Sequence, residues 1–165
     1  PDVIDRALLS LKSKDFPIYY LSPRGVKLDA QISNSISKLD GMTLVCGKYE
    51  GVDERVIKHY NMIEISIGDY ILSGGDLAAM VLIDSVVRSL PNVLGNPLTL
   101  NEESFTNHLL EYPLYTQPRE WKNYKVPDVL LSGDHKKIKN WKIKQSEDIT
   151  MKRRPDLWKK YLKLK

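Results

Sequence analysis

Apolar residues in the first part of the chain follow two spacings, one typical of helices and the other of strands. Residues 18–21 form a short, β-favouring apolar run that predicts a strand, closed by the turn-prone residues 22–25. A second such run covers residues 43–46 and ends at Gly47. Two amphipathic helices are predicted by apolar residues at helical spacing, namely Val3, Ile4, Ala7, Leu8 and Leu11, and then Leu28, Ile32, Ile36 and Leu39.

The same alternation continues along the chain. Asp53 is a candidate N-cap for a short helix that ends near Tyr60. Residues 63–67 alternate between apolar and polar, and residues 70–72 predict one more short strand. Short apolar strands between amphipathic helices predict an α/β fold in which helices cover both faces of a parallel sheet. The longest clear helix follows Asp76 and carries along one side Leu77, Met80, Val81, Asp84 and Val87.

Glycine-bearing segments follow the predicted strands at residues 23–25, 47–51 and 68–75. Because ligands of open parallel sheets bind at the carboxyl ends of the strands, we expect these segments to converge on one pocket. None has the spacing of a dinucleotide-binding or P-loop motif, which disfavours a nicotinamide or ATP phosphate site. Exposed backbone groups with little side-chain bulk suit a neutral aromatic ligand such as adenine, although single glycines of this kind are more often plain turn residues.

The chain changes character after Pro91. Residues 92–102 predict a linker between an α/β domain, residues 1–91, and a small helical domain, residues 103–165. In the second domain, helical patterns cover residues 104–110, 134–145 and 155–162, the last with Pro155 in its first turn.

Charge is divided unevenly between the two parts of the chain. Residues 1–118 hold 10 Lys and Arg against 15 Asp and Glu, whereas residues 119–165 hold 15 against 6. A basic region on a mildly acidic body is typical of a surface that binds a polyanion, and a solvated Lys-rich helix face is the simpler explanation.

Other features of the composition exclude several classes. No apolar run approaches the roughly 20 residues that span a bilayer, and no signal peptide opens the chain, so we expect a cytoplasmic protein without membrane contact. A single cysteine excludes an internal disulfide, and three scattered histidines disfavour a zinc site, so no metal ligand is predicted.

Several segments share the wording of one known family. Residues 44–56 read LVCGKYEGVDERV and residues 66–88 read SIGDYILSGGDLAAMVLIDSVVR. Together these segments resemble the bacterial tRNA guanine-N1 methyltransferases of the SPOUT superfamily, and the similarity runs in order along the chain. Shorter segments similar to that family are residues 20–25, 103–105, 115–118, 126–135, 141–146 and 153–157.

The resemblance implies a fold and a methyl donor. It implies a deep trefoil knot in the α/β domain, which periodicity alone would never suggest, and an opening strand and Gly-rich loop upstream of Pro1. It implies that S-adenosylmethionine binds in the knotted loops and leaves the use of Mg²⁺ open. The donor-binding residues carried across are Tyr20, Leu21, Ser22, Pro23, Gly47, Tyr49, Glu50, Gly51, Ser66, Ile67, Gly68, Tyr70, Leu72, Gly74 and Gly75.

The resemblance also implies a reaction, methylation of N1 of the guanosine 3′ of the anticodon, position 37, in tRNA. Guanine N1 carries a proton at neutral pH, so a general base must remove it and a cation should stabilise charge growing on O6. The family places the base at Glu103, where Asp is usual, and the cation at Arg88, with Glu102 as an alternative base. A helix-start carboxylate and a solvated arginine are the simpler explanations of these two residues.

The implied partners are tRNA and a second copy of the chain, because the family's active site is shared between the subunits of a homodimer. Three residues depart from the family's usual pattern, namely Lys48, Gln117 and Glu147. These departures affect the expected RNA contacts more than the expected donor binding. Trp141 is available for stacking but is more typical of a core residue. Two rival hypotheses remain, another knotted RNA methyltransferase and a non-catalytic RNA-binding module. Candidate tRNA-phosphate contacts are Lys136, Lys137, Lys139, Lys142, Lys144, Lys152, Arg153 and Arg154.

Overall fold

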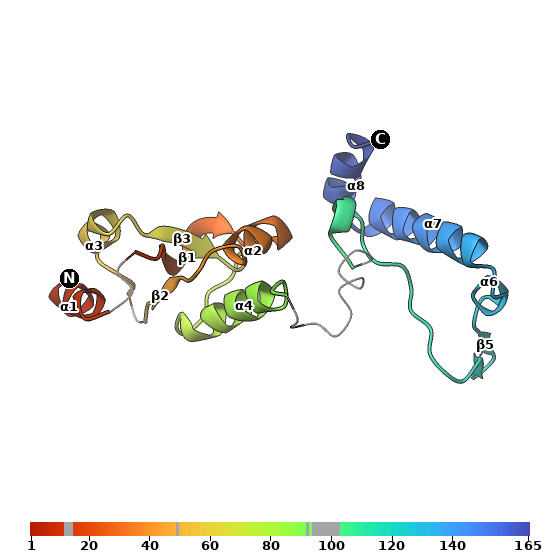
Figure 1. The fold of residues 1–165 in the computed structure, drawn as a ribbon, viewed down its shortest axis with the longest axis horizontal. Coiled ribbons are helices and arrows are strands. Elements are labelled where there is room, and N and C mark those ends of the chain that lie inside the picture. Colours follow the sequence, from red (N-terminus) through yellow and green to blue (C-terminus); the bar gives the residue numbers. More distant parts are fainter. Residues whose placement is uncertain (12–14, 49, 92, 94–102) are drawn as a thin grey trace. The chain divides into compact units, whose positions relative to one another are not determined.

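The computed structural model describes residues 1–11, 15–48, 50–91, 93 and 103–165. The chain forms two compact units, Pro1–Gly95 and Asn96–Lys165, and Figure 1 labels most of their elements. Each unit has its own helices and its own sheet, and each is considered separately below.

A parallel sheet of three strands forms the centre of the first unit. Its strands are β1 (Ile18–Lys27), β2 (Thr43–Cys46) and β3 (Ile63–Ser66), in the spatial order β2-β1-β3. Tyr19 of β1 is opposite Leu44 of β2 on one side and Ile63 of β3 on the other. The predicted α/β fold with a parallel sheet flanked by helices is confirmed.

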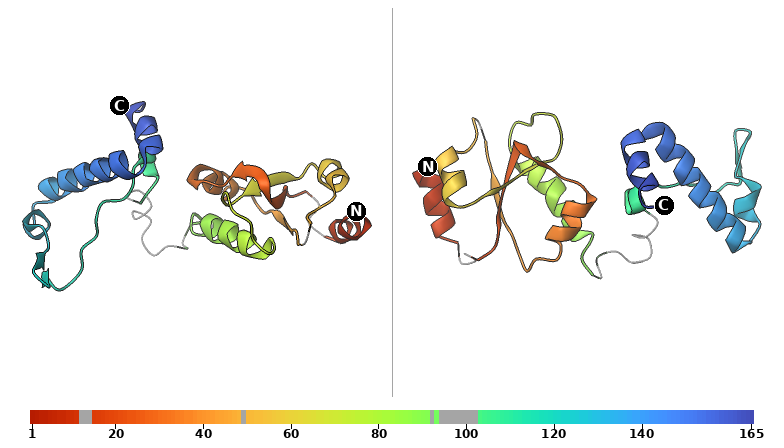
Figure 2. Two further views of the ribbon diagram at one scale, coloured as in Figure 1. Left: turned by 180° about the vertical axis from the view of Figure 1, so that it is seen from behind. Right: turned by 90° about the horizontal axis from the view of Figure 1, so that it is seen from above.

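Helices cover both faces of this sheet. They are α1 (Asp2–Leu9), α2 (Ala30–Ile36), α3 (Glu54–His59) and α4 (Asp76–Val87). Figure 2 (right) shows α1 and α3 on one side of the strands and α2 and α4 on the other. The connection through α2 leads from β1 to β2, and the one through α3 leads across β1 to β3. The two connections run in opposite directions across the sheet, and their helices lie on opposite faces of it. The two crossovers therefore have the same handedness, as β-α-β units of a parallel sheet require.

The side chains of β1 divide the core of the first unit into two clusters, because successive residues of a strand point to opposite faces. Tyr19 and Leu21 are buried in one cluster with residues of α2 and α4, including Leu82. Tyr20 is buried in the other cluster with residues of α1 and α3, including Val56. A strand that is covered on both faces has few polar positions, which explains the apolar run from which it was predicted.

Two predictions for the first unit differ from the structure. The expected turn at residues 22–25 lies inside β1, where the pairing with β3 shifts register between Leu21 and Val26. A Cβ at Gly25 would lie 2.4 Å from the backbone of Glu64, so only glycine allows β1 and β3 to approach this closely. The strand expected at residues 70–72 is wrong: these residues form bends and irregular structure. Tyr70 and Ile71 are exposed, so their apolar character does not mark a buried strand.

Helix α4 buries a different face from the one that its apolar spacing suggested. Its buried residues are Ala78, Ala79, Leu82 and Val86, and the hydroxyl of Ser85 contacts that of Ser33 on α2 at 3.1 Å. The apolar residues on its opposite side remain exposed in the single chain, namely Leu77, Met80, Val81, Ile83 and Val87.

The second unit is mainly helical. Helix α7 is the longest described helix, longer than predicted, and begins where the Asp134 carboxylate accepts hydrogen bonds from two backbone N–H groups. Helix α8 has Pro155 in its first turn, as predicted, and buries Leu157. The buried Thr150 hydroxyl accepts a hydrogen bond from the backbone N–H of Leu110, which ties α7 to the irregular segment before it. The elements are η1 (Thr106–His108), β4 (Glu120–Trp121), β5 (Tyr124–Lys125), α6 (Asp128–Leu131), α7 (His135–Arg153) and α8 (Pro155–Leu162).

Within these described ranges, the structure contains no helix with the length and apolar character needed to cross a bilayer.

Candidate functional site

A cavity of about 470 Å³ lies at the carboxyl ends of the three parallel strands. Its size is in the range of pockets that hold a nucleoside-sized ligand. It is lined by the middle of β1, where the pairing with β2 ends, by the segments that follow β2 and β3, and by the start of α4, so the three glycine-bearing segments do converge. Tyr49, one of the fifteen residues carried over from the resemblance, lies outside the described residues. The other fourteen all line the cavity: Tyr20, Leu21, Ser22, Pro23, Gly47, Glu50, Gly51, Ser66, Ile67, Gly68, Tyr70, Leu72, Gly74 and Gly75.

Tyr20 joins β1 to the segment after β2. Its ring is buried, and its hydroxyl accepts a hydrogen bond of 3.2 Å from the backbone N–H of Val52. A Cβ at Gly47 would lie 3.1 Å from the Tyr20 ring, and one at Gly51 would lie 3.3 Å from its hydroxyl. The two glycines therefore let the backbone of this segment lie directly on the tyrosine.

The start of α4 is held against the end of β2. The backbone N–H of Gly75 donates to the carbonyl of Gly47 at 2.8 Å, and Gly74 forms an isolated bridge with Lys48. A Cβ at Gly75 would lie 2.9 Å from the Cα of Cys46. Backbone contacts this close leave no room for a side chain, so the main chain itself forms this wall of the cavity.

The segment after β3 is shaped by the buried Ser66. Its hydroxyl donates to the carbonyl of Gly68 at 3.1 Å and lies 3.3 Å from the backbone N–H of the same residue. Gly68 has a φ of +156° and would, with a Cβ, meet the ring of Tyr70 at 2.4 Å. Glycine is therefore needed where the chain turns across the cavity.

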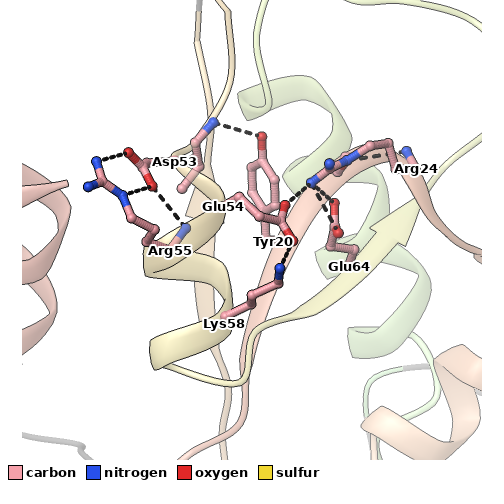
Figure 3. Close-up of polar contacts among 9 residues, drawn as sticks. Tyr20, Arg24, Asp53, Glu54, Arg55, Lys58 and Glu64 are labelled. Carbon is pink, nitrogen blue, oxygen red and sulfur yellow. Dashed lines mark hydrogen bonds and ion pairs between the residues drawn. The ribbon is translucent and has the colours of Figure 1, made fainter.

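An ion-pair cluster beside the cavity was not predicted from the sequence. The guanidinium of Arg24 lies 3.1 Å from the carboxylate of Glu54 and 3.2 Å from that of Glu64 (Figure 3). Lys58 lies 3.6 Å from Glu54, one turn along α3. Arg24 and Glu54 line the cavity, so this cluster connects β1 to α3 and β3 at the cavity edge. Arg24 lies in residues 20–25, a segment similar to the family, but only the folded structure shows its carboxylate partners.

Asp53 caps α3 as predicted. Its carboxylate accepts hydrogen bonds from the backbone N–H of Arg55 at 2.8 Å and from the Arg55 guanidinium (Figure 3). These hydrogen bonds hold the pKa of the Asp53 carboxyl well below its ordinary value. The carboxylate therefore stays ionised. It fixes the first turn of α3, which directly follows the segment with Gly51.

The chemistry of the cavity is that of main-chain recognition. Partial burial is the main cause that raises the pKa of the Cys46 thiol, and the nearby Asp76 carboxylate raises it further. A thiolate nucleophile beside the cavity is therefore disfavoured. The N–H of Gly75 is already paired with the carbonyl of Gly47, but a carbonyl oxygen can accept a second hydrogen bond, so the glycine carbonyls offer acceptors at fixed positions. Such a site can bind a heteroaromatic ring and hold a reactive group in place without supplying a nucleophile.

Neither of the two proposed catalytic residues is among the described residues that line this cavity. Arg88 is the C-cap of α4, is exposed, and donates its backbone N–H to the carbonyl of Asp84. It is not among the described residues that line the cavity. Glu103 belongs to the second unit, where its carbonyl accepts a hydrogen bond from the backbone N–H of Thr106. Both catalytic assignments remain predictions.

The candidate RNA-binding residues gather on one element of the second unit. Trp141 on α7 is only partly exposed, and its ring lies 6.3 Å from that of Tyr115, which fits a packing role better than a free stacking platform. The ammonium of Lys142 lies 4.4 Å above the ring of Tyr112. Seven of the basic residues are on α7 and the eighth is its C-cap: Lys136, Lys137, Lys139, Lys142, Lys144, Lys152, Arg153 and Arg154.

Comparison with known proteins agrees with these features. The family described as tRNA (Guanine-1)-methyltransferase TrmD matches residues 1–160. A tRNA (guanine-N(1)-)-methyltransferase of Pelagibacter ubique is 54% identical over 162 residues, which cover 98% of this chain and 71% of the relative. The enzymes of the same name from Rhodospirillum rubrum and Ehrlichia canis are 51% and 50% identical, covering 98% and 94% of this chain and 68% of each relative. The chain belongs to the tRNA (guanine-1)-methyltransferase TrmD family.

Proposed function

We propose that the chain is an S-adenosylmethionine-dependent methyltransferase that acts on N1 of the guanosine 3′ of the anticodon, position 37, in tRNA. The observation that carries this proposal is the cavity at the strand ends, lined by the glycine-bearing segments of the family motifs. Family membership supplies the substrate class, because the curated relatives carry the name tRNA (guanine-N(1)-)-methyltransferase.

The residues of the cavity fit this donor. Gly47, Gly51 and Gly75 each keep a side chain out of a space bounded by backbone or by Tyr20, which leaves a cradle for a flat adenine ring. Partly buried Ile67 and Leu72 supply apolar surface beside it. When bound, S-adenosylmethionine supplies an electrophilic methyl group.

The chain's residues would supply the proton chemistry. The carboxylate of Glu103 accepts the N1 proton of guanine as the N1–methyl bond forms and the methyl–sulfur bond breaks, leaving S-adenosylhomocysteine. The guanidinium of Arg88 stabilises negative charge on O6. Glu has one more methylene than the Asp usual in the family, so its carboxylate reaches further from the backbone. Mg²⁺ remains an optional component of this proposal.

We infer that the active enzyme is a homodimer whose site is shared between subunits. The exposed apolar face of α4 supports this inference, because apolar side chains clustered on one helix face are typical of a surface that is covered in the assembly. Arg88 directly follows this helix, so pairing across α4 would bring the partner's residues near it. A catalytic carboxylate supplied by the partner would then complete each site.

The remaining features belong to the same proposal. The segment between β3 and α4 returns to the end of β2 through the Lys48–Gly74 bridge, which is compatible with the trefoil knot of the SPOUT superfamily. We propose residues 1–91 as the donor-binding domain, 92–102 as the linker and 103–165 as a helical domain whose basic residues bind tRNA phosphates. A cytoplasmic location follows from the substrate.

A methyl-transfer assay tests this function directly. The chain is incubated with S-adenosylmethionine and a tRNA that carries guanosine 3′ of the anticodon, with an adenosine-substituted tRNA as control. Nucleoside mass spectrometry should find N1-methylguanosine only in the first tRNA. A 2′-O-methyl product or another methylated base would instead support a different knotted methyltransferase. Calorimetric titration without saturable binding of S-adenosylmethionine would support a non-catalytic RNA-binding module.

A further inference from the structure

A groove of about 460 Å³ in the second unit lies outside the site described above. It is formed by the β4–β5 hairpin and the segment before it, and we call it the hairpin groove. Its aromatic and basic lining residues are Tyr115, Trp121, Tyr124 and Lys125. None of them is on α7, which carries the basic residues assigned to tRNA phosphates.

The aromatic rings of the hairpin groove are unusually open to solvent. Trp121 is 59% exposed and Tyr124 is 76% exposed, although they are directly opposite each other in the β4–β5 pairing. A cross-strand aromatic pair stabilises a hairpin, which is the simpler explanation of these two residues. That role needs contact between the rings and does not require most of each ring to face water. The exposed surface is therefore available to a partner.

The turn of the hairpin places charge beside the rings. Lys122 and Asn123 have φ values of 48° and 69°, so the turn places two consecutive residues in the left-handed region. The ammonium of Lys122 lies 4.9 Å from the centre of the Trp121 ring. Lys125 pairs with Glu120 at 3.7 Å on the surface, where such a pair is easily exchanged for a phosphate.

The hairpin groove is connected to the basic helix. The ring of Tyr115, which lines the groove, lies 6.3 Å from that of Trp141 on α7. Trp141 thus acts as packing behind the groove, and the groove's own open rings are on Trp121 and Tyr124. A polyanion bound along α7 would have this aromatic surface next to it.

The geometry points to a stacking subsite in which the hairpin groove holds an unpaired nucleotide of the substrate RNA on Trp121 and Tyr124. This inference rests on the proposed tRNA substrate. Flat, exposed aromatic rings with lysines beside them bind single-stranded nucleic acid, because the bases stack and the phosphates meet the cations. A protein interface is the less suitable alternative, because lysine is depleted at the centre of protein interfaces.

The test measures the RNA affinity of the chain by fluorescence anisotropy with two labelled probes. One is a tRNA anticodon stem–loop with guanosine 3′ of the anticodon, and the other is a fully paired RNA duplex of equal length. Trp121→Ala should weaken stem–loop binding about tenfold, the effect expected from loss of one stacked base. Duplex binding should be unchanged, because paired bases do not reach the rings. Trp121→Phe should stay within about threefold of wild type, because it keeps an aromatic face.

Two further variants separate stacking from charge and from general surface change. Lys125→Ala should lower the slope of log affinity against log salt, whereas Trp121→Ala should leave that slope unchanged. Leu164→Ala is the matched control, since Leu164 is 62% exposed in the same unit and lies outside the groove. It should bind both probes as wild type does.

The inference is overturned if Trp121→Ala binds the stem–loop as tightly as wild type, or if it weakens duplex and stem–loop equally. It is also overturned if light scattering shows that Trp121→Ala changes the oligomeric state, because the groove would then be a protein interface. A wild-type chain that binds the stem–loop but transfers no methyl group contradicts the proposed function and leaves the stacking subsite standing. If wild type binds neither probe, both proposals fail.

Discussion

The hydroxyl of Tyr20 accepts a hydrogen bond of 3.2 Å from the backbone N–H of Val52, and this contact joins β1 to the segment that follows β2. The same ring bounds the approach of Gly47 and Gly51. The position of two walls of the cavity therefore depends on one buried side chain. Because Tyr20 belongs to the core cluster beneath α1 and α3, packing of the first unit and the shape of the cavity are coupled.

Replacing Tyr20 by Phe should weaken donor binding without disrupting the fold. The change removes one hydrogen bond and leaves the N–H of Val52 without its partner, a loss of about 1 kcal/mol. We expect the dissociation constant for S-adenosylmethionine to rise about fivefold and the melting temperature to fall by a few degrees. Calorimetry and thermal denaturation measure the two effects. Tyr60→Phe is the control, because it removes the hydrogen bond from the Tyr60 hydroxyl to Asp5 in the same unit, and Tyr60 is not among the residues that line the cavity. Equal affinity for both variants would contradict this role of Tyr20.

Two adjacent glycines should respond differently to the same substitution. Gly75→Ala places a Cβ 2.9 Å from the backbone of Cys46, whereas Gly74→Ala meets nothing closer than 3.8 Å. We expect Gly75→Ala to destabilise the first unit by about 1–3 kcal/mol, since backbone must move to admit the methyl group, and to weaken donor binding strongly. Gly74→Ala should denature near the wild-type temperature. Urea denaturation of both variants provides the comparison, and equal stabilities would show that the wall at Gly75 is not tightly packed.

The cap of α3 should give the first unit a dependence on acid pH. Hydrogen bonds from Arg55 lower the pKa of Asp53 in the folded chain, so the ionised carboxylate stabilises the fold. That contribution is fully present above the ordinary Asp pKa of about 4 and is lost as the pH falls towards the lower, folded pKa. Asp53→Asn keeps a capping side chain but removes the charge. Its melting temperature should be below that of wild type at pH 7, and the difference should shrink below about pH 4. A constant difference at all pH values would assign the effect to the cap geometry alone.

Local pattern predicted those parts of the fold that depend on nearest neighbours. The Asp53 cap, β2 and helices α1 to α4 follow from spacing and from capping residues. The expected strand at residues 70–72 failed, because apolar Tyr70 and Ile71 face solvent and not the core. A hydropathy pattern marks which residues are apolar, and it does not tell a buried surface from one reserved for a ligand or a partner.

Relationships between distant segments were predicted only in part. The convergence of the glycine-bearing segments followed from the general rule that strand ends meet at one edge of a parallel sheet. The pairing of Arg24 with Glu54 and Glu64 did not, because it depends on the register of β1 against β3. The buried face of α4 was also missed, because it too depends on contacts between segments that are distant in the sequence. That helix has apolar residues on most of its surface, and its packing against the sheet and α2 decides which of them are covered.

A charge on the exposed face of α4 should separate the proposed dimer. Met80→Glu places a carboxylate among Leu77, Val81 and Val87 without touching the buried face. Burying an unpaired charge costs several kcal/mol, so we expect dimer affinity to fall by roughly a hundredfold or more. Light scattering and far-ultraviolet circular dichroism should report a folded monomer, and methyl transfer should be lost. Asn34→Glu adds the same charge at an exposed position of α2 and should leave the dimer intact. A dimeric Met80→Glu variant would rule out this face as the interface.

Replacement of Glu103 by Gln tests the assignment of the general base. Gln keeps the size and polarity of the side chain but cannot accept the N1 proton, so the rate of methyl transfer should fall by about 10²–10⁴-fold. Donor affinity should stay near that of wild type, because the donor cavity is formed by residues of the first unit. Glu103→Asp retains the carboxylate and should keep measurable turnover, while Glu102→Gln is the neighbouring control and should keep full turnover. Single-turnover rates with saturating donor and tRNA, together with calorimetry, distinguish these cases. Full turnover by Glu103→Gln with loss of activity in Glu102→Gln would move the base by one residue, and full turnover by both would remove it from this segment.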